Sequence, residues 1–126
     1  MMIKMVFCVK KKLNVPSKEF FDYWLNQHGP LVKSKTNDLN ILRYVQSHTV
    51  NPELGNGISS ERGMKQEGFE GVAEIWWENL ESLMSATGSD VGKVASQLLA
   101  VDEAKFIDME ASTIFFTEEH EVISIG

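Results

Sequence analysis

Cysteine and proline are scarce in this sequence of 126 residues, which has a single cysteine, Cys8, and three prolines. One cysteine excludes an internal disulfide and is typical of a reducing compartment, so the expected location is cytoplasmic. No apolar run approaches the length of a membrane span, and the stretch from Met1 to Val9 lacks the features of a secretory signal. We therefore expect no membrane partner.

Positive charge is also in short supply, because 12 lysines and arginines stand against 18 aspartates and glutamates, a formal net charge of −6. The basic residues do not collect on one predicted face, so we expect no nucleic-acid partner. The sequence has no Cys/His cluster with zinc spacing, no glycine-rich phosphate loop and no Gly-x-Ser-x-Gly motif. We expect no metal and no cofactor, although a single axial histidine, His28 or His48, leaves haem binding open as an alternative.

The sequence does contain enough apolar material for a single domain over residues 1–126. Hydrophobic residues make up 43% of it, and no internal repeat is visible. Alternation with a period of two predicts strands, and apolar stripes with a period of 3.6 predict helices. The expected strands cover residues 2–11, 41–50, 71–78 and 112–123, and the expected helices begin at residues 17, 79 and 90.

This order, β-α-β-β-α-β, predicts an α+β, ferredoxin-like fold with a four-stranded antiparallel sheet and helices on one face. The strands carry apolar residues on both sides, so we expect the uncovered face to pack against a second copy and form a homodimer. Residues 51–68 are rich in Gly, Ser, Asn and charge. We expect them to form a long, mobile loop that gates a pocket.

A histidine lies on the apolar stripe of the first predicted helix. Trp24 and His28 are four residues apart on that stripe, so the imidazole is expected to point toward the core. Gly29 and Pro30 should bend or end the helix there and leave room for a void. His28 is therefore the candidate general acid or base, with Trp24 and Tyr23 as candidate ligand contacts. The alternative is a core histidine whose two ring nitrogens are both bonded.

Three hydrogen-bonding side chains, Tyr44, Gln46 and His48, alternate along the second predicted strand. In steps of two residues they share one side of the strand, about 7 Å apart. They are the candidate wall of a ligand pocket, and Tyr44 is the best candidate for a hydrogen-bond donor that orients the ligand. A wet sheet face or a dimer interface is an equally good interpretation.

Two further aromatic residues and two aspartates complete the candidates. Trp76 and Phe116 could stack on a flat ring, although aromatic residues on strands pack in cores far more often. Asp108 could orient a histidine as a neighbouring carboxylate, although an acid at the start of a strand is the simpler interpretation. Asp102 is interpreted only as a helix-end or surface acid.

Three blocks of the sequence resemble the EthD-domain family of the dimeric α/β-barrel superfamily: FFDYWLNQHGPLV from residue 20, LRYVQSH from residue 42 and VDEAKFID from residue 101. The resemblance implies a ferredoxin-like subunit whose sheet packs against a partner's sheet, with a small-molecule pocket in each subunit. It also implies relatives that work without metal or organic cofactor, among them lactone isomerases, polyketide dehydratases and monooxygenases. EthD itself is associated with ether degradation.

We therefore predict a small homodimeric, cofactor-independent enzyme that transfers protons in isomerisation, dehydration or lyase chemistry. Its substrate would be a small cyclic or carbonyl-bearing metabolite. Two alternatives remain open at this point. One is a noncatalytic binding or accessory protein in a degradation pathway, and the other is a haem-linked or cofactor-free oxidoreductase or monooxygenase.

Overall fold

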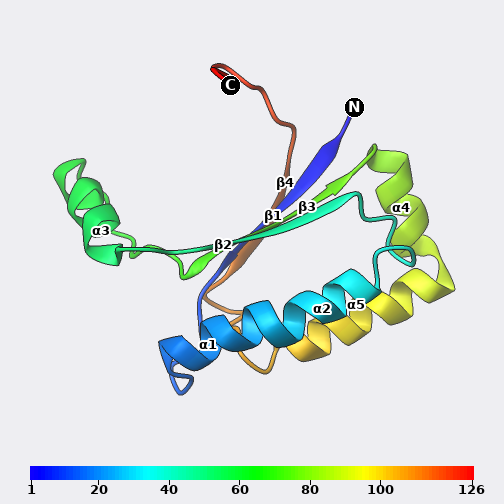
Figure 1. Ribbon diagram of the computed structural model, residues 1–126, viewed down its shortest axis with the longest axis horizontal. Coiled ribbons are helices and arrows are strands. Elements are labelled where there is room, and N and C mark those ends of the chain that lie inside the picture. The colour runs from blue at the N-terminus through cyan, green and yellow to red at the C-terminus, as the bar shows by residue number, and fades with distance from the viewer.

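The computed structural model describes residues 1–126 and has a four-stranded antiparallel sheet with helices on one face (Figure 1). The strands lie in the order β2-β3-β1-β4, so the predicted ferredoxin-like fold is confirmed. None of the helices combines the length and hydropathy that crossing a membrane needs. The elements are β1 Ile3–Val9, α1 Ser17–Tyr23, η1 Trp24–His28, α2 Gly29–Ser34, β2 Arg43–His48, α3 Pro52–Glu61, β3 Gly71–Trp77, α4 Leu80–Gly88, α5 Asp90–Glu103 and β4 Thr113–Thr117.

The first helical stretch runs without a break from α1 through a π-helical turn, η1, into α2, although the sequence predicts a bend or an end at Gly29. Pro30 has no N–H, and its ring would crowd the carbonyl four residues back. The helix accommodates it by widening, because Gly29 donates its N–H to the carbonyl of Trp24, five residues back. This turn holds His28 on the inner side of the helix, where only 4% of it is exposed.

Residues 52–61, expected to belong to a loop, form the helix α3 instead. Pro52 lies in its first turn, where the missing N–H costs nothing, and Leu54 and Ile58 lie four residues apart on one side. No residue of α3 is buried, and Figure 1 shows it standing away from the sheet and the other helices. The prediction of a loop over 51–68 was therefore wrong for these ten residues. A gating role for the segment stays a prediction.

The last strand is shorter than predicted, because β4 ends at Thr117 and not at residue 123. Thr117 pairs with Lys4, which is only one residue from the start of β1 at Ile3. Beyond that pair the chain has no partner strand to continue the ladder. Residues 118–126 accordingly form no strand, and their apolar side chains Val122 and Ile125 are exposed.

The register of the sheet decides which side chains lie under the helices, because directly paired residues of antiparallel strands point to the same face. Met5 pairs with Ile75, and Ile75 pairs with Tyr44, so these three share a face. Ile75 belongs to the core beneath the helices, and Tyr44 packs against it. Tyr44, Gln46 and His48 therefore lie on the helix-covered face. They are neither a wet sheet surface nor part of the face left free for a partner.

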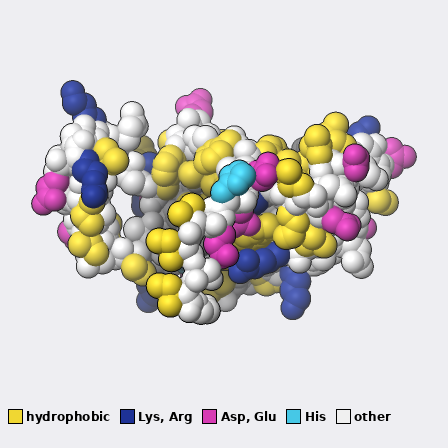
Figure 2. Space-filling view, turned by 90° about the horizontal axis from the view of Figure 1, so that it is seen from above, with side chains coloured by type: hydrophobic (Ala, Val, Ile, Leu, Met, Phe, Trp, Pro, Cys, Tyr) yellow, Lys and Arg dark blue, Asp and Glu magenta, His cyan; other side chains and the backbone are white.

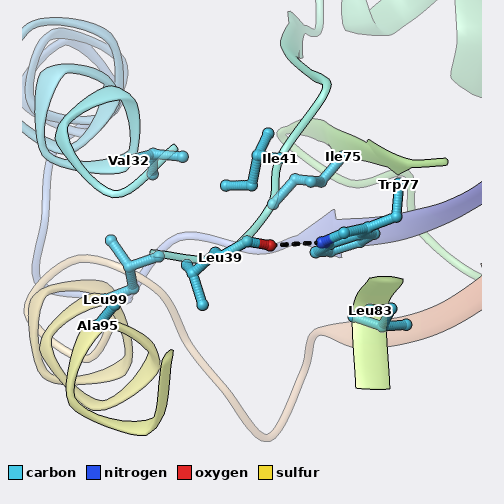
Figure 3. Close-up of a cluster of buried hydrophobic side chains, with 8 residues drawn as sticks. All are labelled: Val32, Leu39, Ile41, Ile75, Trp77, Leu83, Ala95 and Leu99. Atoms are coloured by element: carbon cyan, nitrogen blue, oxygen red, sulfur yellow. Dashed lines mark hydrogen bonds between the residues drawn. The ribbon is translucent and has the colours of Figure 1, made fainter. Parts of the chain in front are cut away.

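The core under the helices divides into two clusters of buried side chains. The first lies between α2, α5 and the sheet and includes Trp77, whose indole N–H donates to the carbonyl of Leu39 at 2.7 Å (Figure 3). The second lies nearer to α1. Its members are Phe7, Val9, Phe20, Trp24, Ala73, Phe106 and Ile107. Tyr44 and Met5 contact both clusters, so they mark the boundary between them.

The opposite face of the sheet carries no helix (Figure 1). Lys4 pairs there with Glu74, the two charged atoms being 2.6 Å apart. Lys4 and Arg43 lie over the ring of Trp76, which is buried beneath them. Figure 2, seen from that side, shows hydrophobic side chains interspersed with charged ones. Besides Trp76, the apolar residues whose register places them on this face are Val6, Cys8, Val45, Val72 and Phe115.

Candidate functional site

A group of polar side chains joins the first helical stretch to the end of α5. His28 belongs to the π-helical turn and is directed inward, as the sequence predicts. Its Nδ1 lies 2.7 Å from Oδ2 of Asp102, the next-to-last residue of α5. The hydroxyl of Tyr23 donates to the other oxygen of Asp102, and Nζ of Lys105 lies 3.4 Å from that same oxygen. The carboxylate of Asp102 thus interacts with a phenol, an imidazole and an ammonium group.

The carboxylate beside His28 is Asp102, which lies at a helix end, as one of its two interpretations held, but is not a surface acid. Only 8% of Asp102 is exposed. Asp108, the predicted partner, instead accepts a hydrogen bond from the N–H of Ala111 at 3.3 Å, within a turn. The sequence held a signal for Asp102, because it continues the stripe of buried α5 residues formed by Gly92, Ala95 and Leu99 at helical spacing.

The protonation states of this group follow from burial and hydrogen bonding. Burial raises the pKa of Asp102, but hydrogen bonds from Tyr23 and His28 outweigh it, so the net pKa lies below the ordinary value. Burial also lowers the pKa of His28, against the opposing pull of Asp102. At neutral pH Asp102 is therefore ionised and His28 is neutral. The neutral imidazole donates from Nδ1 to Asp102, which leaves Nε2 as a free acceptor.

Glu103, which sequence analysis did not single out, faces the other side of the imidazole. Its Oε2 lies 3.7 Å from Nε2 of His28, and 18% of its side chain is exposed. Burial, reinforced by the negative charge of Asp102, raises the pKa of Glu103 to about 7. A helix-end glutamate has no sequence pattern that distinguishes it from a solvated one, so only the packing of α5 could identify it.

Tyr44, Gln46 and His48 form one hydrogen-bonded row beneath the first helix. The amide nitrogen of Gln46 lies 2.8 Å from both the Tyr44 hydroxyl and the carbonyl of Trp24, and its amide oxygen lies 2.8 Å from Nε2 of His48. The His48 ring stacks on Trp24 with centroids 4.5 Å apart. Gly71 makes the stacking possible, because a Cβ there would lie 2.8 Å from the Trp24 ring.

An open groove of about 580 Å³ runs between the first helix and the edge strand β2. Tyr44 and Gln46 line it, together with Leu25, Gly29, Ile41 and Arg43 among others. Trp24 is only 1% exposed and does not line the groove, and neither does His28. Burial raises the pKa of Tyr44 to about 12, and the charge of Glu103 adds to that effect. Tyr44 thus lines the groove and lies within electrostatic range of Glu103.

Residues 12–110 match the family model of the EthD domain. The chain belongs to the EthD-domain family. No curated protein matches the sequence significantly.

Solved structures share the fold of this EthD-domain protein over nearly its whole length. An EthD family protein from Bacillus halodurans is 20% identical, with a TM-score of 0.63, covering 95% of this chain and 100% of its own. A dimeric protein with a ferredoxin-like fold from Bacteroides fragilis is 13% identical, with a TM-score of 0.58 over 94% and 96% of the two chains. A mutant of SnoaB, a cofactor-independent oxygenase from Streptomyces nogalater, is 8% identical, with a TM-score of 0.52 over 97% and 96%.

The remaining aromatic candidates of the EthD-domain protein lie away from His28. Trp76 is on the face of the sheet that carries no helix, where its indole N–H donates to Glu119 at 2.6 Å. Phe116 is half exposed on β4 and lines a separate groove of about 590 Å³ at one end of the sheet. The structure therefore groups Tyr23 with His28, and Tyr44 with Gln46 and His48, but brings neither Trp76 nor Phe116 to them.

Proposed function

We propose that this EthD-domain protein is a small cofactor-independent enzyme that transfers protons in an isomerisation, dehydration or lyase reaction. Its substrate would be a small cyclic or carbonyl-bearing metabolite. The observation that carries the proposal is the bond between Nδ1 of His28 and Asp102 at 2.7 Å. A carboxylate in that position fixes the tautomer and the orientation of an imidazole, so that the second ring nitrogen can accept and return a proton.

The groove that Tyr44 and Gln46 line supplies a place for the ligand. Gln46 donates to the oxygen of the Tyr44 hydroxyl, so the hydroxyl proton is free to point to a ligand oxygen. Because the pKa of Tyr44 is raised to about 12, it remains a neutral donor at every physiological pH. We assign Tyr44 the role of orienting the ligand, and His28 that of the acid or base.

A proton-transfer enzyme of this kind should exchange substrate C–H protons with solvent. We expect the wild-type protein in D₂O to speed the loss of the proton α to the carbonyl in at least one of a panel of ring lactones and cyclic ketones, followed by ¹H NMR. Compounds that bind without exchange would be seen by line broadening alone. Binding without exchange across the whole panel would contradict the proposal for that class of substrate.

That second outcome corresponds to an alternative function, a noncatalytic protein that holds or transports a small metabolite. Its supporting observation is the separation of the groove from His28, of which only 4% is exposed. In that case the groove beside Tyr44 would bind the ligand, and the His28–Asp102 pair would serve only to hold α5 against the first helix.

We also propose that the protein is a homodimer in which two sheets pack face to face as an α/β barrel. Besides the buried Trp76, the face without helices carries five apolar residues in register, Val6, Cys8, Val45, Val72 and Phe115, and 46% of Phe115 is exposed. Analytical ultracentrifugation at micromolar concentration should give twice the mass of the 14.2 kDa chain.

Replacing Val45 on this face with Asp should shift the protein toward the monomer, whereas the same change at the exposed Val94 of α5 should not. A stable wild-type monomer would contradict the proposal.

A further inference from the structure

The carboxyl group of Glu103 lies beside the Nε2 atom of His28. Nδ1 is already engaged by Asp102, so Nε2 is the nitrogen that remains for chemistry. Oε2 of Glu103 lies 3.7 Å from Nε2, just beyond hydrogen-bond length. A small movement of either side chain, or an oxygen atom of a ligand placed between them, would complete a hydrogen bond.

We propose that Glu103 is a second acid–base residue, which shares one proton with His28 and works with it on an oxygen-bearing ligand. This inference rests on the function proposed above and adds a residue to it. The substrate class is narrowed to compounds in which a carbonyl or hydroxyl oxygen lies next to an acidic C–H bond. Glu103 would bind the oxygen, and His28 would remove the proton from the carbon.

The electrostatics around the pair favour a single shared proton. Asp102 lies on one side, and its charge is stabilised by Tyr23, His28 and Lys105. Two adjacent carboxylates in a buried site do not both ionise readily, so the proton goes to Glu103, whose pKa is about 7. The hydroxyl of Tyr44 is the remaining titratable group near Glu103, and it stays protonated. The pair therefore holds one proton near neutrality, with an acceptor at Nε2.

Neither Nε2 of His28 nor the carboxyl group of Glu103 is closed off by a hydrogen-bond partner in the protein. Only one fully buried side-chain polar atom in the protein lacks a hydrogen-bond partner, and it belongs to Glu70. Nε2 of His28 makes no hydrogen bond either, so it must keep some contact with solvent. The Glu103 side chain is 18% exposed. Two polar atoms with no protein partner and a path to solvent are what a site that binds a polar ligand group requires.

The chemistry balances without any further reactant. When Glu103 carries the proton, Nε2 of His28 removes a proton from the carbon next to a carbonyl group, and the electrons of that C–H bond form a C=C bond. Glu103 gives its proton to the carbonyl oxygen, so a ketone becomes its enol. The imidazolium then passes its proton to the carboxylate of Glu103, which restores the starting state. Reversal at the same carbon only exchanges its proton with solvent. If the enol is conjugated with a second C=C bond, running the same steps in reverse at the far carbon of that bond completes an isomerisation.

The proposal is tested by following the Nε2 nitrogen of His28 by ¹⁵N NMR as a function of pH in the full-length protein. In the wild type we expect two inflections, one of them at the titration of Glu103, because coupled groups titrate as a pair. Glu103→Gln should remove that inflection and leave the other. Glu110→Gln, at an exposed position close by in sequence, should leave the curve unchanged.

A reciprocal measurement guards against a variant that folds poorly. The ¹³C-labelled carboxyl group of Glu103 should titrate at a different pH in His28→Gln than in the wild type, because coupling between two sites acts in both directions. Identical His28 curves in the wild type and Glu103→Gln, with an unmoved Glu103 titration in His28→Gln, would overturn the proposal.

Turnover separates this proposal from the function on which it rests. Once a substrate is found, Glu103→Gln should lower kcat about 10²-fold. Full activity in Glu103→Gln together with lost activity in His28→Gln would overturn the role of Glu103 and leave the proposed function standing. If the titrations are coupled but the wild type exchanges no substrate proton, the shared proton is confirmed and the catalytic function is not.

Discussion

Replacing His28 with glutamine is expected to lower kcat about 10²-fold or more, with a folded protein. General acid–base catalysis contributes about 10²–10⁴-fold to enzymatic rates, and glutamine cannot change its protonation state. The fold should survive, because a glutamine amide can still donate to Asp102, which also keeps its bonds to Tyr23 and Lys105. The rate is measured with whichever substrate shows solvent exchange, and folding is checked by circular dichroism.

Two matched variants make this result specific. His120→Gln changes the same residue type at a position where 80% of the side chain is exposed, and it should keep full activity. Tyr44→Phe removes an orienting donor and not the acid or base, so it should cost less than His28→Gln. The pH–rate profile of His28→Gln should also lose its limb near neutrality. Undiminished turnover in His28→Gln would end the catalytic interpretation and leave His28 as a core histidine.

The stability of the protein should decline as the pH rises through neutrality because of Glu103, and Glu103→Gln should remove that decline. The pKa of Glu103 rises from 4.5 to about 7 on folding, with burial as the largest cause. Between these two values the folded state binds more protons than the unfolded state, so the free energy of unfolding falls as pH increases. The stabilisation that the raised pKa of Glu103 contributes to the folded state is fully present below about pH 4.5 and is lost once the pH exceeds about 7.

The size of the effect follows from the shift, at about 1.4 kcal/mol for each pH unit. The difference between about 7 and 4.5 corresponds to an upper bound of about 3 kcal/mol. The free energy of unfolding of Glu103→Gln minus that of the wild type, measured by urea denaturation, should therefore be larger at about pH 8.5 than at about pH 4. The increase should be up to that amount. Glu110→Gln provides the comparison for a solvated glutamate. An equal stability difference at both pH values would show that Glu103 ionises in the folded state as it does in the unfolded chain.

Local sequence patterns determined much of this protein. The alternation along residues 3–9 and 43–48 identified two strands, and the stripe through Trp24 and His28 turned the imidazole inward. The order of the elements was enough to predict the ferredoxin-like sheet. These features depend on residues only a few positions apart, and the spacing of such residues can be read directly from the sequence.

Local patterns were less informative where a segment makes no tertiary contact or breaks the usual spacing. The helix α3 buries no residue, so it has no apolar stripe against a core that would reveal it. The helix continues past Pro30 through a π-helical turn, whereas the local preference of proline is to end a helix. In both places the composition of the segment was a poor guide to its conformation.

The composition of the candidate site was decided by tertiary structure alone. Asp102 bonds to a histidine 74 residues away, and whether Asp102 or Asp108 reaches His28 depends on how α5 packs against the first helix. The same packing places Glu103 beside Nε2 and raises its pKa, since a carboxyl group acquires such a shift only from burial and from the charges around it. A sequence specifies which residues share a face of one helix, but distances between side chains of different helices are set by the close packing of the whole core.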